Sequence, residues 1–418
     1  MTASTARPRL LILADYWGDL GGGEVVSAQL ARALSGRFEI GVLSTDRRRE
    51  SFEHRDGLAV YRIRSDYPVR LRPLLCLANP LSLAGVRRVV SDFKPDVVHA
   101  WNIHQHLSYA SLGLARRAGT PIVLTFQDVQ SFCYTKYHCY IDREAACPSR
   151  PDYRARPERC RACWRHYWLF PPRNRTVRAL IGRYVSQRVS VSQALADALD
   201  DNGLPGAQVI HNCIPLEEFP PSPATVEAVR RRFKLGDEAI VGGGRFGYFK
   251  GQLQVLEAFA RVARQRPKSQ LVLAGRNDGE FGLLLKERTD RLGLAGRVTF
   301  SGFLPRQEFL SLLAAGALFA NLSLAFDSFP TINLEVGAAG RTIIGTCFGG
   351  TPEAVLDGET GRLVNPYRLD DVVRLVNDLL EDADQRAEMG RRAHERVRSV
   401  FPMSSMVEAY SALFSSLA

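Results

Sequence analysis

Residues 239–251 read AIVGGGRFGYFKG, and this stretch decides the fold. It begins with the apolar run Ala239–Gly243, which predicts a buried strand, and continues into a glycine-rich turn. The residues that follow, Gln252–Gln265, carry apolar side chains at helical spacing. Strand, tight turn and helix in this order form the repeating unit of a parallel α/β sheet. Ligands of such sheets bind beyond the carboxyl ends of the strands, so the cations Arg245 and Lys250 in this turn indicate an anionic ligand.

The same alternation of strand and helix runs along most of the chain. In the first half we predict strands and helices, in chain order, at Arg9–Ala14, Glu24–Leu34, Glu39–Ser44, Ala59–Ile63, Leu83–Phe93, Asp96–Ala100 and Ile122–Phe126. In the second half we predict them also at Gln270–Ala274, Glu280–Leu292, Arg297–Phe300, Arg306–Ala315, Leu318–Ala320, Thr331–Ala339, Thr342–Gly345 and Leu369–Glu381. This pattern favours an α/β protein with two Rossmann-like, doubly wound parallel sheets.

The domain organisation follows from length and from the position of the prolines. A chain of 418 residues fits two domains at roughly 100–200 residues each. Several prolines between Pro215 and Pro223 mark a linker. We therefore expect an N-terminal domain over 1–215, with an insertion at about 127–175, and a C-terminal domain over 216–404. A last helix over 405–418 could pack on either domain.

The composition excludes several classes of protein. Hydrophobic residues make up 45% of the chain and charged residues 24%, which excludes a disordered or collagen-like chain. No apolar run approaches the roughly 18 residues of a membrane span, and the apolar start after Arg9 is too short for an export signal. Eight cysteines in this length do not make a disulfide scaffold, so we expect a reduced, cytoplasmic protein.

The positive charge is concentrated in one segment. The chain has 55 Lys and Arg against 44 Asp and Glu, a formal net charge of +11. Eleven arginines lie between Arg150 and Arg188, where Asp152 and Glu158 are the acidic residues. Such a segment attracts phosphates on nucleic acid, on an anionic membrane surface or on a phosphorylated substrate, or it is a solvated surface.

A second ligand signal follows the predicted strand at Leu318–Ala320. Ser328 is suited to cap a helix, and Pro330 is suited to its first turn. A helix N-terminus carries partial positive charge and exposed amides, which favour an anionic ligand. Asp327 precedes this helix and Glu335 lies within it, so both carboxylates can face one ligand and accept hydrogen bonds from sugar hydroxyls.

The run from Arg245 to Pro366 resembles the donor-binding half of the family-4 retaining glycosyltransferases, which have the GT-B fold. Asp327, seven residues and Glu335 resemble the Glu, seven residues, Glu hallmark of that family. The glycine turns that follow this motif match closely, at Gly349–Glu353 and Asp357–Val364. Segments near the family's domain crossover are also matched, at Val191-Ser192 and Ile210-His211-Asn212. The resemblance spans essentially the whole chain and implies two Rossmann-like domains that face each other across a cleft.

The resemblance implies an activity and assigns roles in the second half. It implies retaining transfer of a hexose-type sugar from a nucleotide-sugar, UDP- or GDP-linked, to a hydroxyl acceptor. Arg245 and Lys250 would bind the donor diphosphate, so no cofactor or metal is required for catalysis. Glu335 would accept from the ribose hydroxyls, and Asp327 would approach the transferred sugar. The acceptor would be a glycan, a lipid-linked carrier or a small molecule.

The resemblance also assigns three residues at the start of the predicted helix and one in another loop. Phe329, Pro330 and Thr331 would cradle the transferred sugar. Phe303 lies where the family's base-contacting loop occurs. An acceptor carried by a lipid, together with the basic segment, would bring the protein to the inner face of an anionic membrane.

The first half contributes residues that would face the donor. Gly22 and Gly23 follow the first strand and resemble the family's loop opposite the donor, although without the resemblance a tight strand–helix turn is the favoured explanation. His99 ends a strand and is a candidate catalytic or cleft-lining residue, or a packed core histidine. Gln127 stands where the family usually has a histidine, and glutamine cannot carry a proton. This change, with Asp327 for the usual glutamate, could tune donor choice or weaken activity.

The insertion carries a cysteine cluster with three open interpretations. Its five cysteines could bind a structural zinc, remain as thiols or form disulfides: Cys133, Cys139, Cys147, Cys160 and Cys163. The insertion is also rich in arginine and in the aromatic side chains Tyr134, Tyr137, Tyr140, Tyr153, Trp164, Tyr167 and Trp168. Aromatic faces with guanidinium groups suit a sugar or a pyrophosphate, so we expect the acceptor here.

Three other functions stay open at this point. A nucleotide-sugar epimerase or hydrolase on the same scaffold would release products without an acceptor. A nucleic-acid-binding module would use the basic segment, although no RNA- or DNA-binding motif is present, so nucleic acid is not an expected partner. A degenerate transferase would bind its ligand without turning it over.

Overall fold

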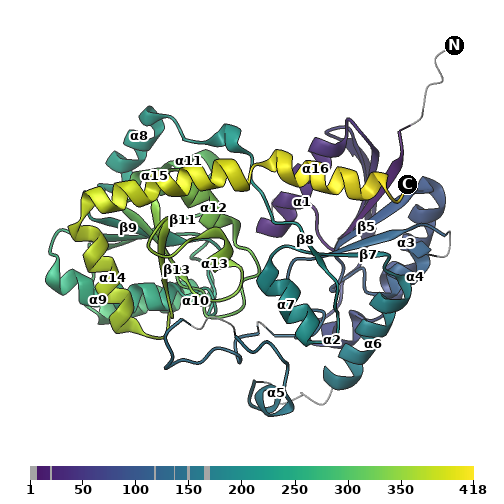
Figure 1. Ribbon diagram of the computed structural model, residues 1–418, viewed down its shortest axis with the longest axis horizontal. Helices are drawn as coiled ribbons and strands as arrows, with labels where there is room; N and C mark the ends of the chain where they lie inside the picture. The colour runs from purple at the N-terminus through teal and green to yellow at the C-terminus, as the bar shows by residue number, and fades with distance from the viewer. Residues whose placement is uncertain (1–6, 19–20, 117–118, 136, 148–150, 164–169) are drawn as a thin grey trace. The chain divides into compact units, whose positions relative to one another are not determined.

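The computed structural model describes residues 7–18, 21–116, 119–135, 137–147, 151–163 and 170–418. The chain divides into two compact α/β units, of which the first comprises Met1–Cys139, Tyr153–Asn212 and Met403–Ala418 (Figure 1). The second unit comprises Tyr140–Asp152 and Cys213–Pro402. The described residues 140–147 and 151–152 therefore belong to the second unit, whereas the sequence predicted that the whole insertion belongs to the first domain. The last helix, which the sequence left open, belongs to the first unit.

The first unit is built on an eight-stranded sheet with the order β3-β4-β2-β1-β5-β6-β7-β8. Its pairs are parallel except for the edge hairpin of β3 and β4. The strands are β1 (Arg9–Ala14), β2 (Glu39–Asp46), β3 (Ser51–Arg55), β4 (Leu58–Arg64), β5 (Val97–Asn102), β6 (Ile122–Phe126), β7 (Gln187–Ser190) and β8 (Gln208–Val209). Side chains of β1, β5 and β6 are almost all buried, as expected for strands covered on both faces.

The helices of the first unit begin at local signals. Asn79 and Ser192 cap α3 and α7 with side-chain oxygens, which accept from the backbone N–H groups of Leu81 and Leu195. The helices of this unit are α1 (Gly22–Leu34), η1 (Val69–Leu71), α2 (Arg72–Leu75), α3 (Pro80–Phe93), α4 (Ala110–Arg116), α5 (Pro157–Cys163), α6 (Phe170–Tyr184), α7 (Gln193–Asp201) and α16 (Met403–Ser415). Across the described residues, no single helix is long and apolar enough to span a membrane, although the bent pair Val69–Leu75 and Pro80–Phe93 passes by length and composition together.

The second unit is built on a six-stranded, all-parallel sheet with the order β11-β10-β9-β12-β13-β14. The strands are β9 (Ala239–Gly243), β10 (Gln270–Ala274), β11 (Val298–Gly302), β12 (Leu318–Asn321), β13 (Thr342–Thr346) and β14 (Gly361–Val364). The chain builds outward from β9 to β11, then crosses back to β12 and builds outward in the other direction. The turns after β9 and β12 therefore meet at a topological switch point, where sheets of this kind bind ligands.

Helices pack against this sheet through apolar stripes. Val255, Phe259 and Val262 of α9 are buried in a core with Leu271 and Leu273 of β10. The helices of the second unit are η3 (Leu216–Glu218), α8 (Pro223–Phe233), α9 (Gln252–Gln265), α10 (Glu280–Arg291), α11 (Arg306–Ala315), α12 (Thr331–Ala338), α13 (Thr351–Ala354), α14 (Leu369–Glu381) and α15 (Ala383–Val400). The two predicted sheets are both present, so the doubly wound α/β architecture is confirmed.

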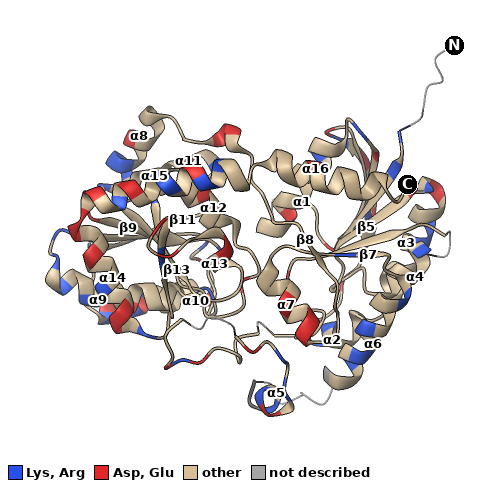
Figure 2. Cartoon of the chain, viewed as in Figure 1, with Lys and Arg blue, Asp and Glu red and all other residues tan. Residues whose placement is uncertain are grey.

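The basic segment maps mainly to α5 and α6 of the first unit (Figure 2). Arg173 is buried and donates to the backbone carbonyl of Gln130, so it is a structural residue. Arg175 and Arg183 of α6 are exposed. Arg150, Arg165 and the aromatic residues Trp164, Tyr167 and Trp168 lie outside the described residues.

Candidate functional site

The turn after β9 lies directly against the loop after β12. A Cβ on Gly251 would come within 1.8 Å of the carbonyl oxygen of Leu322, and Gly251 has a φ of +75°. Only glycine fits this position without moving the backbone. The backbone N–H of Leu324 also donates to the carbonyl of Phe249 at 2.9 Å. Close packing of the two turns brings their side chains to one place at the switch point.

Lys250 and Asp327 form an ion pair at this place. The Lys250 Nζ lies 2.6 Å from Asp327 Oδ2, with 35% of the lysine side chain and 17% of the aspartate side chain exposed. The sequence singled out both residues, and the structure brings them together. The pair is partly open to solvent, so a bound anion can share the ammonium group with the carboxylate.

Arg245 supplies a second cation from the same turn. Its side chain is exposed, and among the ion pairs found in the described residues none involves it. Its backbone carbonyl accepts from Gln252 Nε2 at 3.2 Å, which ties the turn to the start of α9. An exposed guanidinium on an anchored turn is well placed to bind phosphate oxygens.

Helix α12 presents its N-terminus at the end of β12. Its N-cap residue is Pro330, and no side chain hydrogen-bonds to the cap. The expectation that Ser328 caps this helix is therefore wrong, because the helix begins at Thr331, two residues too late for that role. The ring of Phe329 is buried and packs on Phe401 at 5.5 Å between centroids, so it anchors the helix start. The uncapped N-terminus of α12 retains its capacity to attract an anion.

Glu335 is held inside the unit by Arg306. Its Oε1 accepts from Arg306 Nη1, and Arg306 also donates to Glu218 Oε2 at 2.9 and 2.8 Å. Burial raises the pKa of Glu335, and the charge of Arg306 opposes this shift. The sequence identified Glu335 but missed Arg306 and Glu218, because neither belongs to a local motif.

Two further features complete the second unit's candidate site. Phe303, after β11, is 68% exposed, and the Arg276 guanidinium lies 5.0 Å from the centre of its ring. The turn after β13 packs on the loop that carries Asp327, because a Cβ on Gly349 or Gly350 would come within 2.3 or 1.9 Å of its backbone carbonyls. Turns after β9, β11, β12 and β13 thus contribute residues at the same edge of one sheet.

In the first unit, Gly23 and Gln127 lie near each other. A Cβ on Gly23 would lie 3.6 Å from Gln127 Oε1, and the Trp101 indole N–H donates to the Gly23 carbonyl at 3.0 Å. Gln127 and Asn212 exchange two amide hydrogen bonds of 3.1 Å. Gly22 is exposed at the start of α1.

A small pocket of the first unit includes Gln127. Its polar lining includes Asn102, His104, Gln127 and Asp128. His104 Nε2 lies 3.4 Å from Asp128 Oδ2. This pocket offers hydrogen-bonding groups of both kinds, donors and acceptors.

His99 is a core residue, which corrects the expectation of a catalytic role. The side chain is fully buried, and its Nε2 pairs with Thr125 Oγ1 at 2.8 Å. Its ring packs among those of Trp101, Tyr410 and Phe414, and burial lowers its pKa to about 3. A neutral imidazole enclosed in this way does not reach a substrate.

The five-cysteine zinc site is also corrected. Cys147 forms a disulfide with Cys347, so it is not a thiolate ligand, and reduced thiols throughout were the wrong expectation. Within the described ranges, no group of three or more His, Cys, Asp or Glu residues could hold a metal. Cys133 is hydrogen-bonded to Thr135, and the side chain of Cys163 lies outside the described residues. Tyr137 and Tyr140 are buried, so they are not the exposed acceptor platform that the sequence suggested.

Two doubly wound parallel sheets, one with a cationic switch point, fit the architecture of the GT-B glycosyltransferases. Residues 227–396 match the family model of glycosyl transferases group 1, and residues 20–218 match that of Glycosyltransferase Family 4. These ranges together cover most of the chain, which belongs to the glycosyltransferases of these two matched families.

Two relatives with named activities are 27–28% identical to this chain over the residues that align. A GDP-mannose-dependent alpha-(1-6)-phosphatidylinositol monomannoside mannosyltransferase of Mycolicibacterium smegmatis is 28% identical over 53% of this chain, and the match spans 60% of that protein's length. A glycogen synthase of Mycobacterium tuberculosis is 27% identical over 81% of this chain and 74% of its own length.

Solved structures share the fold over nearly the whole chain. The Anabaena protein HepE, solved with UDP-glucose, has a TM-score of 0.73 and 19% identity, covering 98% of this chain and 99% of that one. Sucrose-phosphate synthase of Thermosynechococcus elongatus has a TM-score of 0.76 and 18% identity, with the same coverage of both chains. At these identities the likeness establishes the GT-B fold.

Proposed function

We propose that the protein is a retaining glycosyltransferase that moves a hexose-type sugar from a UDP- or GDP-sugar to a hydroxyl acceptor. The observation that carries this proposal is the convergence of Arg245, Lys250, Asp327 and the uncapped N-terminus of α12 at the switch point of the second unit. Two cations and a helix N-terminus at one sheet edge fit a diphosphate.

The diphosphate is both the anchor of the donor and the leaving group. As the bond between the anomeric carbon and the phosphate oxygen breaks, its electron pair stays on the diphosphate and the sugar gains oxocarbenium character. Arg245, Lys250 and the α12 N-terminus stabilise this growing negative charge, a preorganised effect of about 3–4 kcal/mol for each well-placed donor. In this proposal the two side-chain cations neutralise the charge, so no metal ion is required.

Asp327 and Glu335 orient the two ends of the donor. Asp327 fixes Lys250 before the donor binds and then faces the hydroxyls of the sugar. Glu335, held in place by Arg306, accepts from the ribose hydroxyls. The exposed ring of Phe303 provides a face for the nucleobase, with Arg276 beside it.

We assign the acceptor to the first unit. Its pocket of Asn102, His104, Gln127 and Asp128 can both donate to and accept from a hydroxyl group. A lipid-linked acceptor is supported by the phosphatidylinositol monomannoside named in the mannosyltransferase relative. Together with the exposed arginines of α6, it would place the protein at an anionic membrane surface.

The test begins with a thermal-stability screen of UDP-, GDP-, ADP- and TDP-sugars. A ligand present at 100 times its Kd stabilises the folded protein by about 2.7 kcal/mol, so the true donor raises the melting temperature. The donor is then incubated with and without candidate hydroxyl acceptors, and the anomeric configuration of the product is read by NMR. Release of free sugar or of an altered nucleotide-sugar without an acceptor would instead identify a hydrolase or an epimerase.

A further inference from the structure

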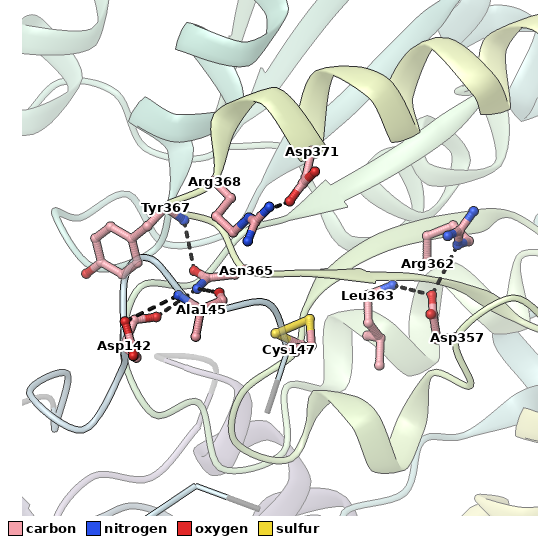
Figure 3. Close-up of a disulfide and its surroundings, with 11 residues drawn as sticks. Asp142, Ala145, Cys147, Asp357, Arg362, Leu363, Asn365, Tyr367, Arg368 and Asp371 are labelled. Carbon is pink, nitrogen blue, oxygen red and sulfur yellow. Dashed lines mark hydrogen bonds and ion pairs between the residues drawn. A yellow bond between two sulfur atoms is a disulfide. The ribbon is translucent and has the colours of Figure 1, made fainter. Parts of the chain in front are cut away.

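A short segment that interrupts the first unit in sequence is fastened to the second unit. The strap, residues 140–147, runs along the loop after β14 (Figure 3). Asn365 Nδ2 donates to the carbonyls of Asp142 and Ala145 at 2.8 and 2.7 Å, and Arg368 Nη1 donates to the carbonyl of Glu144 at 3.1 Å. One buried amide thus satisfies two strap carbonyls, which fixes the path of its backbone.

The far end of the strap is covalently joined to the turn after β13. Cys147 forms a disulfide with Cys347, 200 residues away in sequence (Figure 3). The backbone N–H of Cys347 donates to the carbonyl of Val364 at 3.0 Å, so the cysteine is held at the end of the sheet. The next residues, Phe348 to Gly350, form the turn that packs on the backbone of Asp327 and Ser328.

The near end of the strap contacts both loops that meet at Asp327. The ring of Tyr140 lies 5.9 Å from that of Phe326 and 6.0 Å from that of Phe348, measured between centroids. Phe326 immediately precedes Asp327, and Phe348 immediately follows Cys347. All three rings are buried, so the Tyr140 ring packs between the two loops as a wedge that contacts Phe326 of one and Phe348 of the other.

We infer that the strap is a disulfide-fastened positioning element that holds the 322–329 loop and the 347–351 turn in their ligand-binding arrangement. The inference rests on the proposed function, because its consequence is weaker binding of the sugar end of the donor when the disulfide opens. Opening it frees the strap at Cys147, loosens the Tyr140 wedge and lets Asp327 move. Arg245 and Lys250 lie on a different turn, so binding of the diphosphate alone weakens less than binding of the sugar.

The disulfide opens by thiol–disulfide exchange with a dithiol reductant. One reductant thiolate attacks a sulfur of the pair, forms a mixed disulfide and releases the other cysteine as a thiolate. The second reductant thiol then closes a cyclic disulfide and releases the first cysteine. The protein gains two electrons and two protons, and the reductant loses them. A small disulfide, present as oxidant, reverses the reaction.

The ligand-free protein supplies the first test. Alkylation after denaturation counts the thiols at Cys147 and Cys347 with and without reduction, and we expect two more in the reduced sample. Amide hydrogen exchange in 322–329 and 347–351 should be about tenfold faster after reduction or in the Cys147→Ser/Cys347→Ser variant, while β9 stays unchanged. Equal thiol counts, or equal exchange in these peptides, overturn the inference.

A variant that keeps both cysteines tests the inference even if the Cys147→Ser/Cys347→Ser variant fails to fold. Asn365→Asp retains the acceptor for the Tyr367 N–H but loses the two donors to the strap. We expect faster exchange in the same two peptides with the disulfide intact. Cys213→Ser, a buried cysteine of the same unit outside the disulfide, is the matched control and should keep the wild-type exchange pattern.

Binding measurements separate this inference from the proposed function. Reduction should raise the Kd of the preferred probe, UDP-glucose or GDP-mannose, about tenfold and that of UDP or GDP less than about threefold. If no nucleotide binds the oxidised protein, the proposed function fails, and the link from strap to donor fails with it. If nucleotides and nucleotide-sugars bind with the same Kd to the oxidised and the reduced protein, the strap inference fails and the proposed function stands.

Discussion

Replacing Arg306 with alanine tests the electrostatic arrangement around Glu335. Glu335 is buried, and Arg306 is the cation that contacts its carboxylate. The substitution leaves this carboxylate in a desolvated position without its counter-charge. It also removes the partner of Glu218, which is more exposed and therefore less costly to leave alone.

The expected loss in the free energy of unfolding of Arg306→Ala follows from the burial of the Arg306–Glu335 ion pair. Removing one partner of a fully buried ion pair costs about 3–5 kcal/mol. The Arg306 side chain is 37% exposed, so water reduces this figure, and we expect about 2 kcal/mol at pH 8. Burial already raises the pKa of Glu335, and loss of Arg306 raises it further.

The pH dependence has a definite sign. Because the folded-state pKa of Glu335 lies above the unfolded value, the folded state binds the extra proton, and stability falls as pH rises through the folded pKa. The deficit of Arg306→Ala should therefore be largest near pH 8 and should shrink toward pH 5. Adding Glu335→Gln removes the buried charge and should recover much of the loss.

We would monitor urea unfolding at pH 5 and pH 8 by hydrogen exchange in β9 and α12. These elements report the free energy of unfolding of the second unit separately from that of the first. A protein of two units need not unfold in one step, so a whole-chain probe would mix them. The assignment of Arg306 as the counter-charge of a buried Glu335 would be refuted by either of two results. One is a free energy of unfolding of Arg306→Ala less than about 0.5 kcal/mol below that of the wild type at pH 8, and the other is an equal difference at both pH values.

Three other predictions address the turn after β9 and the first unit's core. Lys250→Ala should lower donor turnover about 100-fold or more with a small change in melting temperature, whereas the exposed Lys268→Ala in the same unit should leave turnover unchanged; equal rates would exclude Lys250 from the reaction. Gly251→Ala should cost at least about 2 kcal/mol in urea unfolding, whereas Gly236→Ala, which meets only a side-chain atom at 3.7 Å, should be nearly neutral. Burial lowers the pKa of His99 to about 3 in the folded protein, so the ring is neutral there. The free energy of unfolding of the wild type should therefore fall by up to about 1.4 kcal/mol for each pH unit below pH 6.5, as measured by urea unfolding. The free energy of unfolding of His99→Gln should fall less steeply with pH, because the variant lacks this group.

Much of the fold was predictable because it follows from local periodicity. The strands β9 and β10 and the helices α9, α11 and α14 begin and end at the predicted residues. The sequence missed β14, because this strand begins with Gly361 and Arg362 and its apolar run is only two residues long. It also missed the edge strand β3, whose side chains are mostly exposed. A strand pattern is weak where burial on both faces does not shape it.

The candidate site was predictable where its residues share one loop or helix. Asp327 and Glu335 stand out by their spacing around a helix start, and Lys250 stands out in its glycine turn. Arg306 could not be found this way, because its contact with Glu335 depends on how α11 packs beside α12. The Cys147–Cys347 disulfide spans 200 residues, and no local pattern pairs these cysteines.

His99 shows how a correct element can carry a wrong role. The sequence placed it on a strand, as the structure does, and a strand-end position in this fold favours ligand contact. Its environment is set by Tyr410 and Phe414 of α16, which lie about 300 residues later in the chain and cover the ring. Burial by a remote helix leaves no trace near residue 99.

The central claim is that the switch point of the second unit binds a nucleoside diphosphate through Arg245 and Lys250. Calorimetric titration of UDP and GDP into wild type and into Arg245→Ala tests it most directly. We predict that at least one of the two binds wild type and that its Kd rises at least about tenfold in the variant, the loss expected for a charge-assisted contact. If neither binds wild type, or if the variant binds with unchanged affinity, the claim is contradicted.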